Sequence, residues 1–186
     1  GWTSTMRPSA PAAIAAREAG LQYILITDHT KRLAMTGGLN DKKVLEQKRE
    51  IERLNKKLKG ITILSGAEVD ILKDGSLDLE DKTLKQLDIV GVSIHSYFKL
   101  SRAEQTGRVI RAIKNPHVDI LFHPTGRRIN RRPPIDIDIE KIIEVAQETG
   151  TVLEINASPG RLDLKDEHIK MARDVGCRFA ISSDAH

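Results

Sequence analysis

The sequence has one cysteine, Cys177, among its 186 residues, so no disulfide can form within the chain. Proteins without disulfides are typical of reducing compartments, and we therefore expect a cytoplasmic location. Aromatic residues make up only 3% of the chain, too few for the stacking platforms with which non-catalytic proteins bind single-stranded nucleic acids. No apolar run approaches the roughly 20 residues that a membrane span needs, so we expect no membrane partner.

What is present is ordinary for a globular protein: 39% hydrophobic and 30% charged residues. The sequence shows no repeat, low-complexity stretch or linker, and we expect one domain over residues 1–186, long enough to bury a sizeable core. The net charge of +4 is compatible with an anionic substrate but does not require one.

Strand-like and helix-like segments alternate along the chain. Short apolar runs near 23–27, 61–72, 88–94, 119–122, 152–155 and 178–182 are typical of buried strands. Amphipathic patterns predict helices near 9–19, 41–58, 81–87, 101–113, 138–146 and 165–174. We expect Asn40 and Asp138 to cap two of these helices, and Ser101 with Glu104 to form a capping box at the start of a third. This alternation predicts an α/β fold with a parallel sheet and right-handed crossovers.

Imidazole and carboxylate side chains lie at or near the end of almost every predicted strand. These residues are His29, Glu68, His95, His123, Asp184 and His186. Because the carboxyl ends of the strands in a β/α barrel surround one mouth, this distribution favours a barrel over a doubly wound sheet. Such ligands suit zinc, manganese or iron, and the absence of thiolates argues against a structural zinc site. His117 and His168 lie away from strand ends, and we expect them to be bystanders.

Six short motifs also resemble, in order, those of PHP (polymerase and histidinol phosphatase) domains. They are Ile-Thr-Asp-His (26–29), Gly-Ala-Glu-Val (66–69), Ser-Ile-His-Ser (93–96), Leu-Phe-His-Pro-Thr-Gly-Arg (121–127), Leu-Glu-Ile-Asn-Ala (153–157) and Ser-Asp-Ala-His (183–186). The stretches 126–132 and 161–168 are most similar to the version attached to the C-terminus of family X DNA polymerases. The resemblance covers nearly the whole chain.

This resemblance implies a distorted, TIM-like (β/α) barrel of seven strands that holds two to three divalent metal ions. It makes Glu68 a ligand shared by two metals, with His95 and His123 completing one of the two sites. It also implies that Glu68, Asp184 and His186 take part in catalysis.

The remaining positions carry the other predicted roles. By resemblance, Asp184 would bind the second metal, and His29 and His186 would bind the third. Asp28 and Asn156 would support the ligands from behind, for example by orienting an imidazole.

One element of the family pattern is absent from these 186 residues. PHP domains open with a strand that carries His-x-His, and no such motif occurs here. Only the site of Glu68, His95 and His123 would then have its full set of protein ligands. We therefore expect the sequence to be part of a longer chain that also contains polymerase domains.

Arginines crowd the loops that follow the predicted ligands. Arg127, Arg128, Arg131 and Arg132 come after His123, and Arg161 lies beyond Asn156. Guanidinium groups bind phosphate with two parallel hydrogen bonds, so we expect Arg127, Arg128, Arg131 and Arg161 to grip a DNA backbone without sequence specificity.

The sequence thus predicts a metal-dependent phosphoesterase that hydrolyses DNA phosphodiesters, acting as the 3′-5′ exonuclease of a family X polymerase in DNA repair. Two alternatives stay open. One is a small-molecule phosphatase of the histidinol-phosphatase type, and the other is a PHP scaffold with a degraded site.

Overall fold

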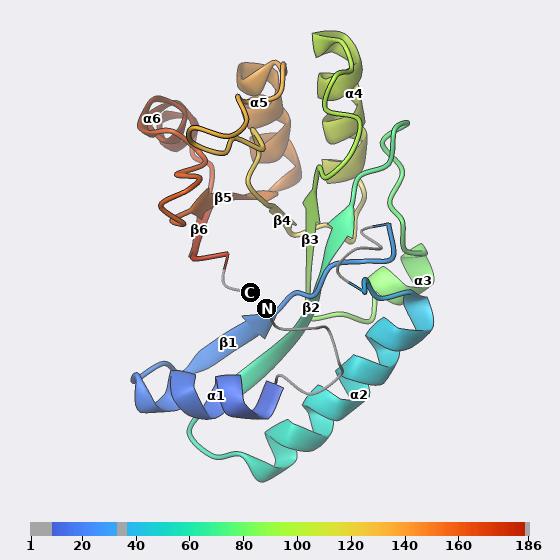
Figure 1. Cartoon of the computed structure of the whole chain (residues 1–186), viewed down its shortest axis with the longest axis vertical. Helices are drawn as coiled ribbons and strands as arrows, with labels where there is room; N and C mark the ends of the chain where they lie inside the picture. The colour runs from blue at the N-terminus through green and yellow to red at the C-terminus, as the bar shows by residue number, and fades with distance from the viewer. Residues whose placement is uncertain (1–8, 33–36, 185–186) are drawn as a thin grey trace.

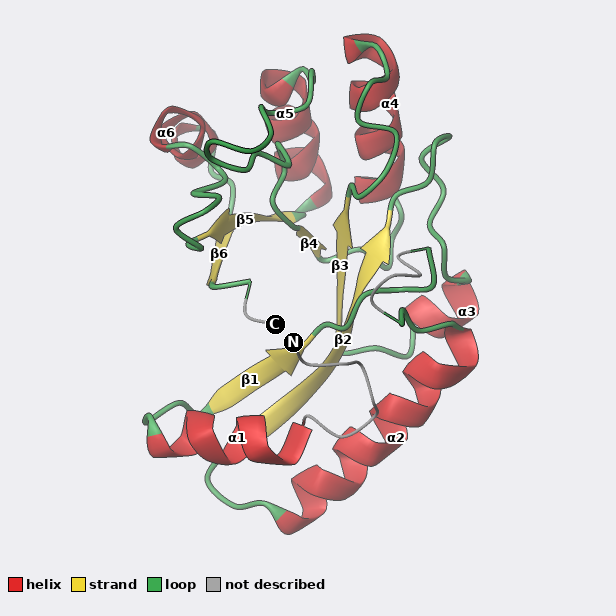
Figure 2. Ribbon diagram, viewed as in Figure 1, coloured by secondary structure: helices red, strands yellow, loops and turns green. Residues whose placement is uncertain are grey.

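The computed structural model describes residues 9–32 and 37–184. Six strands form one parallel sheet in which each strand lies beside its neighbours in sequence. They are β1 (Tyr23–Ile26), β2 (Thr62–Asp70), β3 (Ile89–Ser93), β4 (Ile120–Leu121), β5 (Val152–Asn156) and β6 (Phe179–Ser182). Figure 2 shows the strands following a curve with the helices on its outer side, so the sheet is a curled half-barrel.

The helices cover the outside of this curve. They are α1 (Ser9–Glu18), α2 (Asp41–Lys57), α3 (Asp81–Leu84), α4 (Arg102–Ile113), α5 (Ile139–Thr149) and α6 (Asp166–Asp174). The predicted caps are present: the side chains of Asn40 and Asp138 accept hydrogen bonds from the first turns of α2 and α5. Ser101 and Glu104 form a reciprocal capping box at the start of α4.

The apolar core lies between the sheet and the helices. The larger cluster joins strands β2 to β5 to helices α4 and α5, and a smaller one lies between β2 and the helices α1 and α2. Successive residues of a strand point to opposite faces, and β2 shows the consequence. Ala67 and Val69 belong to the core, whereas the alternate residues Glu68 and Asp70 are buried polar groups. The inner face of the curved sheet therefore carries buried carboxylates.

The predicted alternation of helices and parallel strands is confirmed, with element ends within a few residues of those expected. In the described residues β1 pairs with β2 and β6 pairs with β5, and no pairing joins β1 to β6 (Figure 1). None of the helices in the described ranges combines the length and the apolar character that a membrane crossing requires.

Candidate metal centre

Three of the predicted ligands meet around a fourth, the carboxylate of Glu68. Glu68 lies near the end of β2 and is only 6% exposed. His29 follows β1 and pairs with Glu68 through a backbone bridge, while His95 follows β3 and His123 follows β4. Strand order in the sheet thus brings together residues up to 94 positions apart, counted from His29 to His123.

The imidazole rings surround both oxygens of Glu68. Oε1 lies 2.9 Å from Nε2 of His123 and 3.2 Å from Nε2 of His95. Oε2 lies 3.2 Å from Nδ1 of His29. The ring of His95 packs edge-on between the other two, with centroid separations of 4.9 Å to His29 and 5.3 Å to His123.

The imidazoles control the ionisation of the carboxylate. Burial by itself would raise the pKa of Glu68, but hydrogen bonds from His123 and His95 and their charges hold it well below its usual range. Burial would likewise lower the pKa of His95, yet hydrogen bonds with Asp70 and Glu68 raise it to about 9. Without a metal, the cluster therefore balances a buried anion with imidazolium charge.

These residues fit a divalent cation. Ligand atoms of His29, Glu68 and His95 all lie within 4.8 Å of one another. In the described part of the chain Nδ1 of His123 is buried without a hydrogen-bond partner. A carboxylate with several imidazoles is a donor set that zinc, manganese and iron accept, and a cation here would replace the proton charge on the imidazoles.

Asp70 contacts one of the predicted ligands, His95, and the sequence analysis missed it. Its Oδ1 lies 3.1 Å from Nδ1 of His95 and accepts the backbone N–H of His95 at 3.2 Å. It fixes the imidazole so that Nε2 faces Glu68, as carboxylates behind metal ligands commonly do. The signal was available, because Asp70 follows Glu68 by two residues in β2 and so shares its face.

A second network fixes the loop after β1. The backbone N–H groups of Arg32 and Asp70 donate to the carboxylate of Asp78, at 3.0 Å and 3.3 Å. The hydroxyl of Thr30, the residue after His29, donates to the same carboxylate. Burial raises the pKa of Asp78, since hydrogen bonds from Thr30 and Arg32 only partly offset it. This network joins the His29 loop to the end of β2.

Glu154 is another buried carboxylate without a predicted role. It accepts the backbone N–H of His123 at 2.6 Å and the side-chain amide of Asn156 at 3.3 Å, and Ser182 also donates to it. Burial raises the pKa of Glu154. Asn156, predicted to support the ligands, is therefore linked to the backbone of His123 through the carboxylate of Glu154.

The other predicted residues that the structure describes make contacts outside the three imidazoles. The carboxylate of Asp28 accepts a hydrogen bond from Gln47 of α2, which ties the end of β1 to that helix. Asp184 accepts a hydrogen bond from Nε of Arg161 at 2.6 Å. His186 lies outside the described residues. The roles of Asp28, Asp184 and His186 stay predictions.

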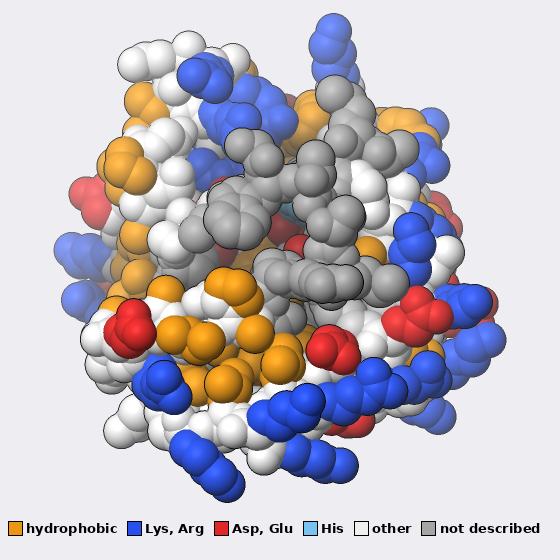
Figure 3. Space-filling view, turned by 60° about the horizontal axis from the view of Figure 1, so that its bottom comes forward, with side chains coloured by type: hydrophobic (Ala, Val, Ile, Leu, Met, Phe, Trp, Pro, Cys, Tyr) orange, Lys and Arg blue, Asp and Glu red, His pale blue; other side chains and the backbone are white. Residues whose placement is uncertain are grey.

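The arginines differ in how they are held. Arg161 is 7% exposed, and Nη1 of its guanidinium has no hydrogen-bond partner among the described residues. Arg127 donates to the backbone carbonyls of Arg161 and Leu162, and so ties the two basic loops together. Arg128 and Arg131 are exposed. Figure 3 shows Lys and Arg side chains spread around the margin of one face of the molecule.

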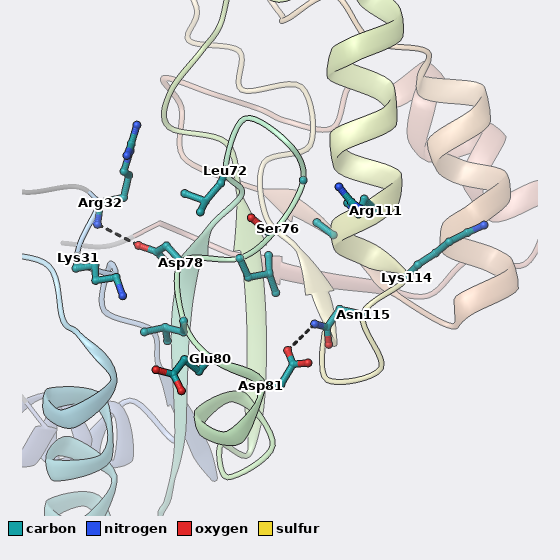
Figure 4. Close-up of a pocket in the computed structure, with 14 residues that line it drawn as sticks. Lys31, Arg32, Leu72, Ser76, Asp78, Glu80, Asp81, Arg111, Lys114 and Asn115 are labelled. Atoms are coloured by element: carbon teal, nitrogen blue, oxygen red, sulfur yellow. Dashed lines mark hydrogen bonds between the residues drawn. The ribbon is translucent and has the colours of Figure 1, made fainter.

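A cavity of about 1010 Å³ lies to one side of the cluster. It is lined by the hairpin after β2, the start of α3 and the last turn of α4, with Lys31 and Arg32 at one wall (Figure 4). None of the predicted ligands lines it. Asp78 belongs to its wall, so the cavity adjoins the support of the His29 loop and not the cluster itself.

Comparisons with known proteins identify relatives of the chain. No protein-family model matches the chain. The chain is 46% identical over 167 residues to the DNA polymerase/3′-5′ exonuclease PolX of Bacillus subtilis (strain 168). The aligned residues make up 90% of this chain and 29% of that protein. It is 39% identical over 187 residues to a probable phosphatase of Thermoanaerobacter sp. (strain X514), covering 92% of this chain and 70% of that protein.

A solved structure shows the same fold. It is the histidinol phosphate phosphatase of Lactococcus lactis complexed with zinc, L-histidinol and phosphate. The two structures superpose with a TM-score of 0.66 at 14% sequence identity, and the match covers 98% of this chain and 81% of the phosphatase chain. Together with the phosphatase relative and the site geometry, this confirms the resemblance drawn from the motifs. The chain belongs to the PHP (polymerase and histidinol phosphatase) family.

Proposed function

We propose that the protein is a metal-dependent phosphoesterase whose centre is built on Glu68. The observation that carries this proposal is the convergence of three imidazoles on one buried carboxylate at the carboxyl end of the sheet. His29, Glu68, His95 and His123 would hold the metal. Divalent ions held there would stabilise negative charge on a phosphoryl group and make a bound water more acidic.

The surrounding residues would position the ligands and the substrate. Asp70 keeps Nε2 of His95 directed at the centre, and Glu154 holds the backbone of His123. Arg161 keeps one guanidinium nitrogen without a partner among the described residues, and that nitrogen could donate to a phosphoryl oxygen. The exposed Arg128 and Arg131 would contact the phosphates of a longer substrate.

We propose that this substrate is DNA, from which nucleotides are removed in the 3′-to-5′ direction. Two observations support this: the 46% identity to PolX, a protein named as a 3′-5′ exonuclease, and the arginines of the two loops. The chain spans 29% of PolX, so the polymerase domains and the role in repair also belong to the proposal.

A small-molecule phosphatase is the second candidate. The probable phosphatase of Thermoanaerobacter supports it, because the chain covers 70% of that protein at 39% identity. The scaffold alternative is weaker, since a scaffold gains nothing from keeping His29, Glu68, His95 and His123 around one point.

One experiment separates these candidates. The full natural protein is incubated with manganese and either a 5′-labelled single-stranded oligonucleotide or small phosphate monoesters, including L-histidinol phosphate. A ladder of shortened, labelled products supports the exonuclease. If phosphate is released from the monoesters while the oligonucleotide stays intact, the result supports the phosphatase. If neither substrate is hydrolysed, the result supports the scaffold.

Glu68→Gln tests the centre itself. We expect at least a hundredfold loss of hydrolysis, because the amide keeps the shape of the side chain but removes the charge that the metal and the imidazoles need. Glu140→Gln, an exposed change on α5, serves as the matched control and should leave the rate unchanged. Activity of Glu68→Gln within about tenfold of the wild type would mean that the centre lies elsewhere.

A further inference from the structure

A half-exposed aromatic ring closely follows one of the predicted metal ligands in the chain. Tyr97 follows His95 by two residues and is 40% exposed. The other exposed tyrosine of the described residues, Tyr23, is 64% exposed and begins β1, so it lies at the opposite end of the parallel sheet. Among the residues in the described ranges, Tyr97 is thus the exposed aromatic residue on the side where the predicted ligands gather.

The backbone at Tyr97 is held in an unfavourable conformation. Its φ is +57°, in the left-handed region that bulky residues rarely adopt. Two side chains of α4 fix it: Gln105 donates to the carbonyl of Tyr97 at 2.7 Å, and Arg108 donates to the carbonyl of Ser96 at 3.1 Å. Gln105 and Arg108 are both buried. Such strain persists where the surroundings over-determine it, and it occurs most often at functional sites.

The ring itself is held from a second loop. Nη2 of Arg32 donates to the hydroxyl of Tyr97 at 2.6 Å, and its guanidinium carbon lies 5.5 Å from the ring centroid. Arg32 follows His29 by three residues, whereas Tyr97 follows His95 by two. The loops that carry two metal ligands therefore meet at this ring, which fixes its position relative to the centre.

We propose that Tyr97 stacks against the nucleobase of the terminal nucleotide and so selects nucleic-acid strands over small phosphate esters. This inference rests on the proposed function and names the part of the substrate that the site recognises. Every nucleobase has a flat face, so one fixed ring beside the reacting phosphate can hold any terminal base without reading sequence. The exposed guanidinium of Arg32 adds a positive charge next to the position of that nucleotide.

The test compares two oligonucleotides of the same sequence, one ending in a normal nucleotide and one ending in an abasic sugar. With the full natural protein and manganese, we expect the base-bearing end to be removed about tenfold faster. Tyr97→Phe keeps the ring and should keep this ratio. Tyr97→Asn, a residue that tolerates a positive φ, should bring the ratio close to one.

Several controls accompany this comparison. Tyr23→Asn should leave the ratio unchanged, because Tyr23 lies at the other end of the sheet. Unfolding midpoints and metal content verify that the Tyr97 variants are folded, and Tyr97→Gly, which relieves the strain, replaces Tyr97→Asn if that variant does not fold.

The outcomes distinguish the two proposals. If the wild type shortens both oligonucleotides and Tyr97→Asn or Tyr97→Gly keeps the wild-type ratio, the stacking proposal is wrong and the proposed function stands. If the wild type shortens neither oligonucleotide but hydrolyses a phosphate monoester, the exonuclease proposal fails and the stacking proposal fails with it.

Discussion

Asp70 shows how one residue outside the ligand set can determine the geometry of the centre. Its carboxylate contacts both the imidazole and the backbone N–H of His95. We expect Asp70→Asn to weaken metal binding about tenfold or more, because the amide keeps the shape but loses the charge that makes His95 a stronger ligand. Titration of metal-free protein with manganese or zinc measures the change.

Asp174→Asn, at the exposed end of α6, is a suitable control for this prediction and should bind metal as the wild type does. The unfolding midpoint of metal-free Asp70→Asn should also be measured, so that lost affinity is not mistaken for lost fold. Wild-type affinity in a folded Asp70→Asn protein would mean that His95 does not need this carboxylate.

At the same scale, the sequence predicts which side chains converge better than it predicts which side chains hold them in place. His29, Glu68, His95 and His123 could be found because each follows an apolar run, and parallel strands bring their carboxyl ends together. Glu154 could not, because a carboxylate inside a strand has the same sequence signal whether it faces a metal ligand or water. Asp70 could be found only through its two-residue spacing from Glu68, which places both side chains on one face of β2. Arg161 was predicted to grip phosphate, and only the structure shows its pairing with Asp184.

At the scale of elements, the contact between β3 and β4 positions His123. Gly91 of β3 faces Phe122, the residue before His123, and a Cβ added at Gly91 would lie 1.9 Å from the Phe122 ring. We expect Gly91→Ala to lower the free energy of unfolding by about 1–3 kcal/mol, because the buried ring must move. Urea denaturation measures this change.

Two further variants sharpen the Gly91 prediction. Phe122→Leu should reduce the cost of Gly91→Ala, since it removes the ring that clashes, and a double-mutant cycle reports that coupling. Gly107→Ala adds the same methyl group in α4 where no atom lies within 4 Å, and should stabilise the protein by up to about 1 kcal/mol. Equal effects at the two glycines would contradict the packing argument.

The elements themselves were predictable because their signals are local. Asn40, Asp138 and the pair of Ser101 with Glu104 marked helix starts that the structure reproduces. Strand ends were less certain: the run before His29 suggested a longer strand than β1, which ends at Ile26. Beyond Ile26 two backbone hydrogen bonds, which form the bridge of His29 with Glu68, continue the pairing with β2, and no apolar pattern predicts these contacts.

At the scale of the whole molecule, metal binding should stabilise the fold, because the predicted ligands follow four different strands. The ligands come from the ends of β1, β2, β3 and β4, so a bound cation stabilises all four relative to the unfolded chain, in which no such site exists. A cation at a hundredfold excess over its dissociation constant contributes about 2.7 kcal/mol. For a chain of this length, we expect this to raise the unfolding midpoint by about 5–10 °C.

Differential scanning calorimetry with and without manganese, after treatment with a chelator, measures this shift. Glu68→Ala removes the carboxylate around which His29, His95 and His123 are arranged, so its midpoint should not respond to metal. Because the readout is stability, it separates metal binding from catalysis: a shift without hydrolysis still confirms the centre. A wild-type midpoint that manganese and zinc leave unchanged would contradict metal binding by the cluster. An equal shift in Glu68→Ala would show that the metal binds without this carboxylate.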